Sequence, residues 1–137
     1  MMADAPTLAA LRAAAFAAME HAYAPYSNFR VGAALLAPGG EIVGGCNVEN
    51  SAYQAGNCAE RVAVGAAVVR GLRNFTHVVV ATEADVPTPP CGICRQVLWE
   101  LAPECHVISV TRGGAEAHWP LADLLPHPFT PSSLRNE

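Results

Sequence analysis

The stretch HVVVATEADVPTPPCGICRQVLWELAPECHVISV, residues 77–110, decides the fold class of this chain. It begins with the β-branched run His77–Ala81 and ends with a second run, His106–Val110, and both are typical of buried strands. Between them, apolar residues recur at i, i+3, i+4 and i+7, which indicates a helix, and Pro90 is expected to open it. Strands that alternate with helices in this way predict a mixed sheet between helical layers.

The elements around this stretch complete the predicted sheet. Helical spacing of apolar residues predicts a first helix over residues 7–22, with Asp4 and Thr7 as candidate caps. A second helix is expected over Cys58–Arg70, ended by Gly71. The remaining expectations are strands at 31–36, 41–46 and 115–119, a loop at 47–57, a helical turn at 120–125 and a tail at 126–137. The sequence thus predicts an α/β fold, a three-layer α-β-α sandwich with a mixed five-stranded sheet.

Composition narrows the class of protein. The 137 residues suit one domain, and 52% of them are hydrophobic against 15% charged. The mean hydropathy of +0.24 is high for so short a chain, so the surplus apolar surface predicts subunit interfaces. The net charge is −4 and all eight cations are arginines, so no cationic surface for nucleic acid or an anionic membrane is expected.

Sequence features also predict the compartment. The N-terminus has no cationic segment before an apolar one, so no signal peptide is expected, and no apolar stretch is long enough to span a membrane. Five cysteines, an odd number, suit a reducing cytoplasm better than a disulfide framework.

Three cysteines have the pattern of a metal site. Cys58 opens one predicted helix, while Cys91 and Cys94 share one face of the next at i, i+3 spacing. Thiolates at helix N-termini suit zinc, and three protein ligands leave the fourth position for a water. Glu60, two residues after the first ligand, could move that water's protons. The pattern therefore predicts a zinc hydrolase with Glu60 as the catalytic residue.

Other interpretations of these residues remain open at this stage. Cys-x-x-Cys alone also suits a redox pair, and a structural zinc could take Cys46, Cys105 or His106 as its fourth ligand. Glu60 could form a capping box with Asn57. Arg61 could offset the charge of the thiolates and donate to the sulfurs, or could be a solvated helix residue.

These motifs, taken together, resemble the zinc-dependent deaminases and specifically the small cytidine deaminases. Five blocks carry the resemblance in order: PYSNFRVGAAL at 25–35, GCNVEN at 45–50, CAER at 58–61, PCGICRQVL at 90–98 and LLPHPFTP at 124–131. It covers nearly the whole chain and implies a single deaminase domain over residues 1–137. It also implies one zinc per chain and hydrolysis of cytidine and 2′-deoxycytidine to uridine and 2′-deoxyuridine in pyrimidine salvage.

The resemblance implies roles for further residues. Phe29 would stack on the pyrimidine, Asn47 and Glu49 would hold the ribose hydroxyls, and the Ala59 backbone would contact the base. In the homotetramer typical of the family, Tyr53 and Phe129 would reach the site of a neighbouring subunit. The first metal ligand is a cysteine rather than a histidine. In this the chain resembles the tetrameric enzymes that act on free nucleosides.

One segment departs from the family pattern. Residues 54–57, Gln-Ala-Gly-Asn, are polar where the family usually has a largely apolar segment of the same length. A blasticidin-S-type nucleoside deaminase shares the zinc motifs and is the nearest alternative, although Asn47-Val48-Glu49-Asn50 would not be expected in it. A zinc or redox module without catalysis is the alternative from another class, and it would have no need of Glu60.

Overall fold

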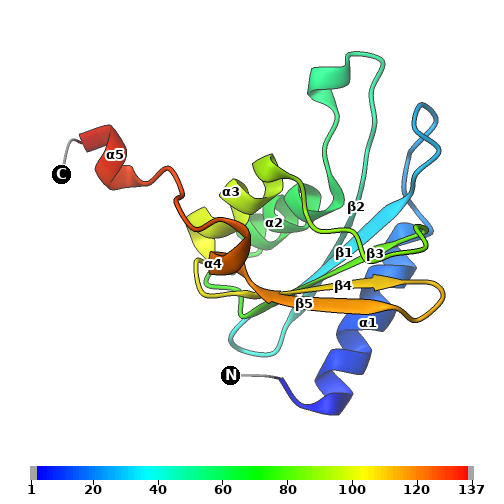
Figure 1. The fold of residues 1–137 in the computed structure, drawn as a ribbon, viewed down its shortest axis with the longest axis horizontal. Helices are drawn as coiled ribbons and strands as arrows, with labels where there is room; N and C mark the ends of the chain where they lie inside the picture. The colour runs from blue at the N-terminus through cyan, green and yellow to red at the C-terminus, as the bar shows by residue number, and fades with distance from the viewer. Residues whose placement is uncertain (1–2, 136–137) are drawn as a thin grey trace.

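The computed structural model describes residues 3–135, which form one five-stranded sheet flanked by helices (Figure 1). The elements in chain order are α1 (Ala5–Met19), β1 (Val31–Leu36), β2 (Ile42–Cys46), a 3-10 helix (Tyr53–Ala55), α2 (Ala59–Val69), β3 (His77–Thr82), α3 (Gly92–Leu101), β4 (His106–Thr111), β5 (Glu116–Pro120), α4 (Leu121–Leu124) and α5 (Pro131–Arg135). None of the helices in this described part is long and apolar enough to cross a membrane.

The sheet is mixed, as the sequence predicts. Its strand order is β2-β1-β3-β4-β5. The β3–β4 pair is parallel, with His77 opposite His106 and Thr82 opposite Thr111, and the other three pairs are antiparallel. A parallel pair needs a crossover connection, and α3 provides it between β3 and β4. The stretch 77–110 therefore builds the centre of the sheet.

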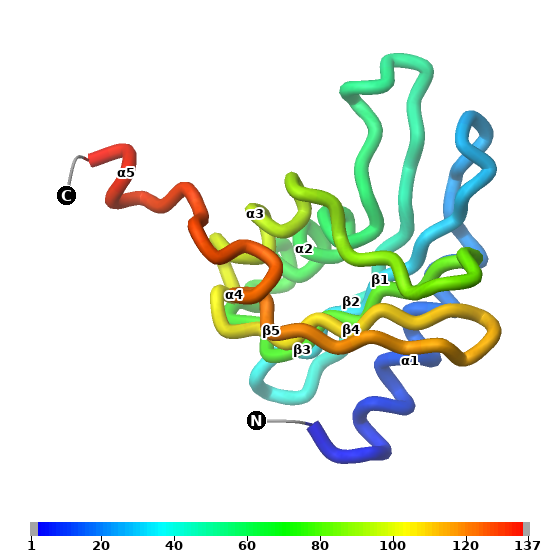
Figure 2. Tube along the Cα trace, viewed as in Figure 1, coloured from blue at the N-terminus to red at the C-terminus, as the bar shows by residue number. Residues whose placement is uncertain are grey.

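Alternating side chains give the sheet two buried faces. Helix α1 lies on one side of the sheet and helices α2 and α3 on the other, which makes three layers (Figure 2). On one face, Val78, Val80 and Val107 belong to the core that includes residues of α2 and α3. On the other, Val79 and Ile108 pack with α1, whose Leu11, Ala15 and Met19 are fully buried. The two layers of helices confirm the predicted α-β-α sandwich.

Two strand glycines allow the helices to lie close to the sheet. A Cβ added at Gly32 would lie 1.9 Å from the carbonyl oxygen of Ala15 in α1. A Cβ at Gly45 would lie 2.5 Å from the backbone nitrogen of Ala63 in α2. Both distances are far below van der Waals contact, so these positions need glycine. The contact at Gly45 sets how closely α2 approaches β2.

The helix boundaries differ from the predicted ones in physically informative ways. Helix α1 begins at Ala5, because Asp4 caps it by accepting a hydrogen bond from the Thr7 backbone at 2.8 Å. It ends at Met19 rather than residue 22, since the following chain turns and the Tyr23 N–H donates to the Asn47 carbonyl at 2.9 Å.

One prediction about helix starts is wrong, and one alternative interpretation is excluded. Helix α3 begins at Gly92 with Cys91 as its N-cap, whereas Pro90 lies buried in the preceding loop and its carbonyl accepts from Arg95 Nε at 2.7 Å. The N-cap of α2 is Cys58, so Asn57 and Glu60 do not form a capping box. Within the predicted tail, Pro131–Arg135 form α5, and residues 136–137 lie outside the described part.

Candidate active site

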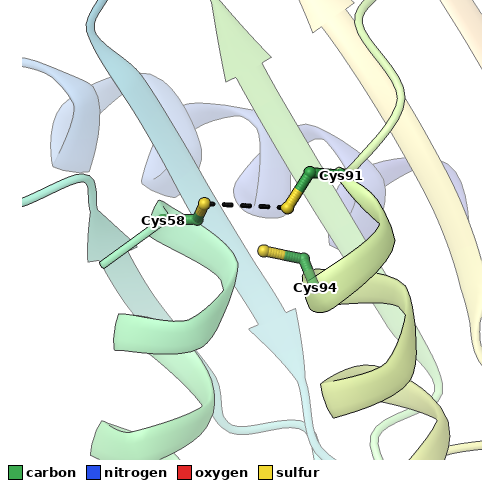
Figure 3. A group of neighbouring side chains, drawn as sticks. All are labelled: Cys58, Cys91 and Cys94. Atoms are coloured by element: carbon green, nitrogen blue, oxygen red, sulfur yellow. Dashed lines mark hydrogen bonds between the residues drawn. The ribbon is translucent and has the colours of Figure 1, made fainter. Parts of the chain in front are cut away.

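Two helix N-termini meet above one face of the sheet and bring three sulfurs together. Cys58 is the N-cap of α2 and Cys91 the N-cap of α3, and Cys94 lies in the first turn of α3. The side chains point toward one another from the two helices (Figure 3). Neither cysteine at an N-cap makes a side-chain capping hydrogen bond, so both sulfurs are available for another partner.

The spacing of the sulfurs fits a tetrahedral zinc. All three Sγ atoms lie within 4.8 Å of one another, and those of Cys58 and Cys91 are 3.8 Å apart. Two sulfurs bound to one tetrahedral zinc at about 2.3 Å each lie about 3.8 Å from one another. The donor set is soft and has one ligand fewer than a closed structural site, so it leaves one coordination position for water.

Hydrogen bonding favours the thiolate form of the Cys58 side chain. A hydrogen bond with Cys94, followed by one with Arg61, lowers the pKa of Cys58 to about 5 in spite of its partial burial. The same hydrogen bond with Cys58, followed by burial, raises the pKa of Cys94. A deprotonated sulfur is the form in which cysteine binds metals.

The carboxyl group of Glu60 is buried beside these sulfurs. Glu60 lies in the first turn of α2 and its side chain is only 4% exposed. Burial raises its pKa to about 7, and the charge of Cys58 adds to the rise. A carboxyl group with a pKa near neutral can both accept and donate a proton, which is what a general acid–base residue must do.

Arg61 connects the metal-binding residues to the loop before α2. Its Nη2 atom donates to the Gly56 carbonyl at 3.3 Å and lies 3.8 Å from the Sγ atom of Cys58. Its Nε atom is buried and has no hydrogen-bond partner among residues 3–135. The guanidinium therefore lies where it can offset the negative charge of the thiolates.

A cavity of about 410 Å³ opens beside the cysteines. Its lining includes most of the residues that the sequence suggests for the site: Phe29, Asn47, Glu49, Tyr53, Cys58, Ala59, Glu60, Arg61 and Cys91. Cys94 is fully buried behind it. A volume of this size suits a small molecule such as a nucleoside.

The end of the cavity away from the cysteines is held by hydrogen bonds. The Asn47 amide oxygen accepts from the Val31 backbone N–H at 2.9 Å, and its nitrogen donates to the Phe29 carbonyl at 2.8 Å. The Glu49 carboxylate accepts from Ser27 and from the backbone of residue 26. These contacts tie the segment after β2 to the segment before β1.

Two predicted residues lie at the margin of the site or away from it. Tyr53 is 80% exposed and its ring meets that of Tyr26 edge-on, with centroids 6.1 Å apart. Phe129 does not line the cavity; it lies in the segment that runs away from the sheet toward α5 (Figure 1) and is 58% exposed. The amide of Gln96 holds the backbone of Phe129 by two hydrogen bonds, of 2.7 and 3.3 Å.

Some lining residues were not assigned a role from the sequence. Ser27, Thr82 and Thr88 all line the cavity. Ser27 stands in the motif at 25–35, yet nothing in a linear motif indicates that it contacts Glu49. Of the other cysteines, Cys46 ends β2 and Cys105 is buried before β4, and neither belongs to the group of three sulfurs.

Comparisons with known proteins agree with this geometry. The family model described as "Cytidine and deoxycytidylate deaminase zinc-binding region" matches residues 7–110. The chain is 46% identical over 119 residues to a cytidine deaminase of Sporosarcina psychrophila, covering 85% of this chain and 87% of the relative. It is 38% identical over 124 residues to the cytidine deaminase of Mycobacterium tuberculosis strain H37Rv, covering 90% and 80%.

A solved structure is similar over almost its whole length. The crystal structure of cytidine deaminase from Burkholderia pseudomallei superposes with a TM-score of 0.85 at 47% identity, covering 88% of this chain and 98% of the other. The fold, the three sulfurs and the sequence matches lead to one conclusion. This chain is a member of the cytidine and deoxycytidylate deaminase family, whose members bind zinc.

Proposed function

We propose that this protein hydrolyses cytidine and 2′-deoxycytidine to uridine and 2′-deoxyuridine with release of ammonia, in pyrimidine salvage. The observation that carries the proposal is the buried carboxyl group of Glu60 beside three clustered sulfurs at the bottom of an open cavity. In this proposal Cys58, Cys91 and Cys94 hold one zinc ion per chain. A zinc module without catalysis would give no reason to bury an acid at this position.

The residues of the site suffice for the proton transfers. When bound, zinc would supply a water of lowered pKa as the nucleophile. Glu60 accepts a proton from the water and delivers it to ring nitrogen N3, so that C4 can accept the oxygen. Glu60 then moves the second water proton to the amino group, the C4–N bond breaks, and ammonia leaves. The water oxygen becomes the C4 carbonyl of the product.

The remaining lining residues would orient the nucleoside. Phe29 would stack on the base, and the Ala59 backbone would contact the base near the cysteines. Asn47 and Glu49 would bind the hydroxyls of the sugar, because an amide can donate and accept whereas a carboxylate accepts. Arg61 would balance the charge of the thiolates.

The charges of the cavity favour a nucleoside over a nucleotide. Arg61 is the one cation among the residues that line the cavity in the described chain, and its guanidinium already contacts Gly56 and Cys58. The end of the cavity away from the cysteines carries the carboxylate of Glu49 instead. The pKa of this carboxylate is lowered, chiefly by its hydrogen bond with the Ser27 hydroxyl, so its negative charge is favoured. A 5′-phosphate would find no counter-charge at that end.

Assembly and location complete the proposal. We propose a cytoplasmic homotetramer with shared active sites, in which Tyr53 and Phe129 reach a neighbouring subunit. Both aromatic rings are exposed in the single chain, as is Val69 at 88%, and burial of such groups stabilises an interface. All five cysteines are free, which suits a reducing compartment.

One assay tests the activity directly. The zinc-loaded protein is incubated with cytidine, 2′-deoxycytidine, 2′-deoxycytidine 5′-monophosphate, cytosine and blasticidin S, and loss of the cytosine ultraviolet band is followed. We expect turnover of the two nucleosides and little of the nucleotide or the free base. Exclusive turnover of blasticidin S would support the alternative deaminase, and no turnover by protein that contains zinc would support a module without catalysis.

A further inference from the structure

The carboxylate of Glu49 is held from one side by the segment before β1. Its Oε1 atom accepts from the backbone N–H groups of Tyr26 at 2.9 Å and Ser27 at 3.0 Å, and its Oε2 atom accepts from the Ser27 hydroxyl. Ser27 and Glu49 are 22 residues apart in the sequence, and both line the cavity. Ser27 thus contacts both oxygens of the carboxylate.

The Ser27 hydroxyl has a second partner on the base-binding side. Its oxygen accepts from the Phe29 backbone N–H at 3.0 Å, while its proton goes to Glu49, because an ionised carboxylate can only accept. Asn28, between these two residues, has a φ of 55°, a left-handed conformation that asparagine tolerates better than most residues. One hydroxyl therefore links Phe29 to Glu49.

The hydrogen bonds leave Glu49 with little free capacity. A carboxylate offers about four lone-pair directions, and three of them are filled by Tyr26 and Ser27. The open direction belongs to Oε2, the oxygen that the Ser27 hydroxyl holds. Asn47 likewise uses one donor and one acceptor on backbone groups, at Phe29 and Val31. The free acceptor on Glu49 can therefore receive one hydroxyl donor.

We propose that Ser27 is a positioning residue for sugar recognition: it directs the open lone pair of Glu49 toward a sugar hydroxyl. The inference rests on the proposed function, because it assumes that a cytosine nucleoside occupies the cavity. Without the Ser27 hydroxyl, Oε1 would still be held by two backbone groups, but Oε2 would lose the one donor that it has within residues 3–135. The free lone pair would then no longer have a fixed direction.

The test is Ser27→Ala, measured with cytidine and with 2′,3′-dideoxycytidine, which has no hydroxyl at the 2′ and 3′ positions of the sugar. We expect the KM for cytidine to rise about tenfold with kcat little changed, as for a weakened bond to a charged group. The kcat/KM for dideoxycytidine should change much less, because Ser27 and Phe29 are exposed enough for water to replace the hydroxyl on the Phe29 N–H. A merely structural role would lower the kcat/KM for cytidine and the kcat/KM for dideoxycytidine equally, and that result would overturn the proposal.

Three further variants complete the design. Ser27→Thr keeps a hydroxyl and should retain most of the preference for cytidine. Ser51→Ala removes an exposed hydroxyl from a loop position that does not line the cavity, and should have no effect. In a Glu49→Ala background, Ser27→Ala should raise the KM for cytidine no further, and additive effects of the two substitutions would contradict the proposal. Failure of the unsubstituted protein to deaminate cytidine would instead refute the proposed function.

Discussion

The two ends of the cavity are built in different ways. At the cysteine end, Cys58 and Glu60 belong to the start of α2 and Cys94 to the start of α3, and Glu60 and Cys94 are buried. At the sugar end, Ser27 and Glu49 lie on loops, Ser27 is exposed, and the carboxylate is oriented by loop hydrogen bonds. Helix starts packed on a sheet hold atoms more rigidly than loops do. Substitutions at the first end should therefore reduce turnover or metal binding, and substitutions at the second should raise KM.

The largest expected effect is that of Glu60→Gln. The amide keeps the shape of the side chain but cannot accept and return protons, so kcat should fall by at least roughly 10²–10⁴-fold, and by more if Glu60 acts in several steps. Zinc content, measured by atomic emission, should remain about one per chain, as in the unsubstituted control. Near-normal turnover in a zinc-loaded variant would remove Glu60 from the mechanism.

Metal content should separate the cysteines into two groups. Cys91→Ala should lower bound zinc sharply and reduce thermal stability, because metal binding is coupled to the packing of α2 and α3. Cys46→Ala and Cys105→Ala are the matched controls and should keep about one zinc per chain, since neither sulfur belongs to the group of three. A requirement for either control cysteine would indicate a closed structural site.

Phe129→Ala tests whether the active site is completed by a second chain. In the proposed tetramer this substitution removes an aromatic contact to the bound nucleoside, worth about 1–3 kcal/mol by analogy with base stacking, and should raise the KM for cytidine. The melting temperature should fall only slightly, because Phe129 is 58% exposed and contributes little to the core of its own subunit. Light scattering gives the mass of the assembly, and a fully active monomer would refute shared sites.

The smallest expected effect lies outside both ends of the cavity. Glu20 accepts from Arg112 at 2.6 Å and from Arg30 at 3.3 Å, and all three side chains are at least one-third exposed. Exposed ion pairs are screened by solvent and salt, so Glu20→Gln should lower the melting temperature by no more than about 3 °C. Kinetic constants should not change, and a clear rise in KM would show that this network supports the sugar end.

The sequence predicts the regular parts of the fold well where local signals act alone. Val31–Leu36 is a strand, as expected. Gly71 follows the end of α2 with a φ of 78°, and the Leu72 N–H donates to the Ala67 carbonyl at 3.0 Å. β-branched runs, helical spacing and a C-terminal glycine need no distant partner to be recognised. The grouping of the three cysteines also follows from helix starts and spacing.

The features that the sequence does not predict depend on tertiary contacts. Pro90 has the local chemistry of a first helical residue, yet the structure uses its carbonyl to bind the side chain of Arg95 and starts α3 two residues later. The link between Ser27 and Glu49 joins two loops across 22 residues of sequence. Such contacts depend on how the loops fold back over the sheet, and no local pattern encodes that.

The close approach of α2 to β2 also makes two glycines, Gly45 and Gly65, differ in how well they should tolerate substitution. At Gly45 any side chain must push against the backbone of Ala63 and Ala59, and these residues belong to the helix that carries Glu60. At Gly65, on the same helix, an added Cβ would meet nothing within 4 Å. An alanine at position 65 should therefore fit the single chain without strain, whereas even one methyl group at position 45 would push α2, and Glu60 with it, away from the sheet.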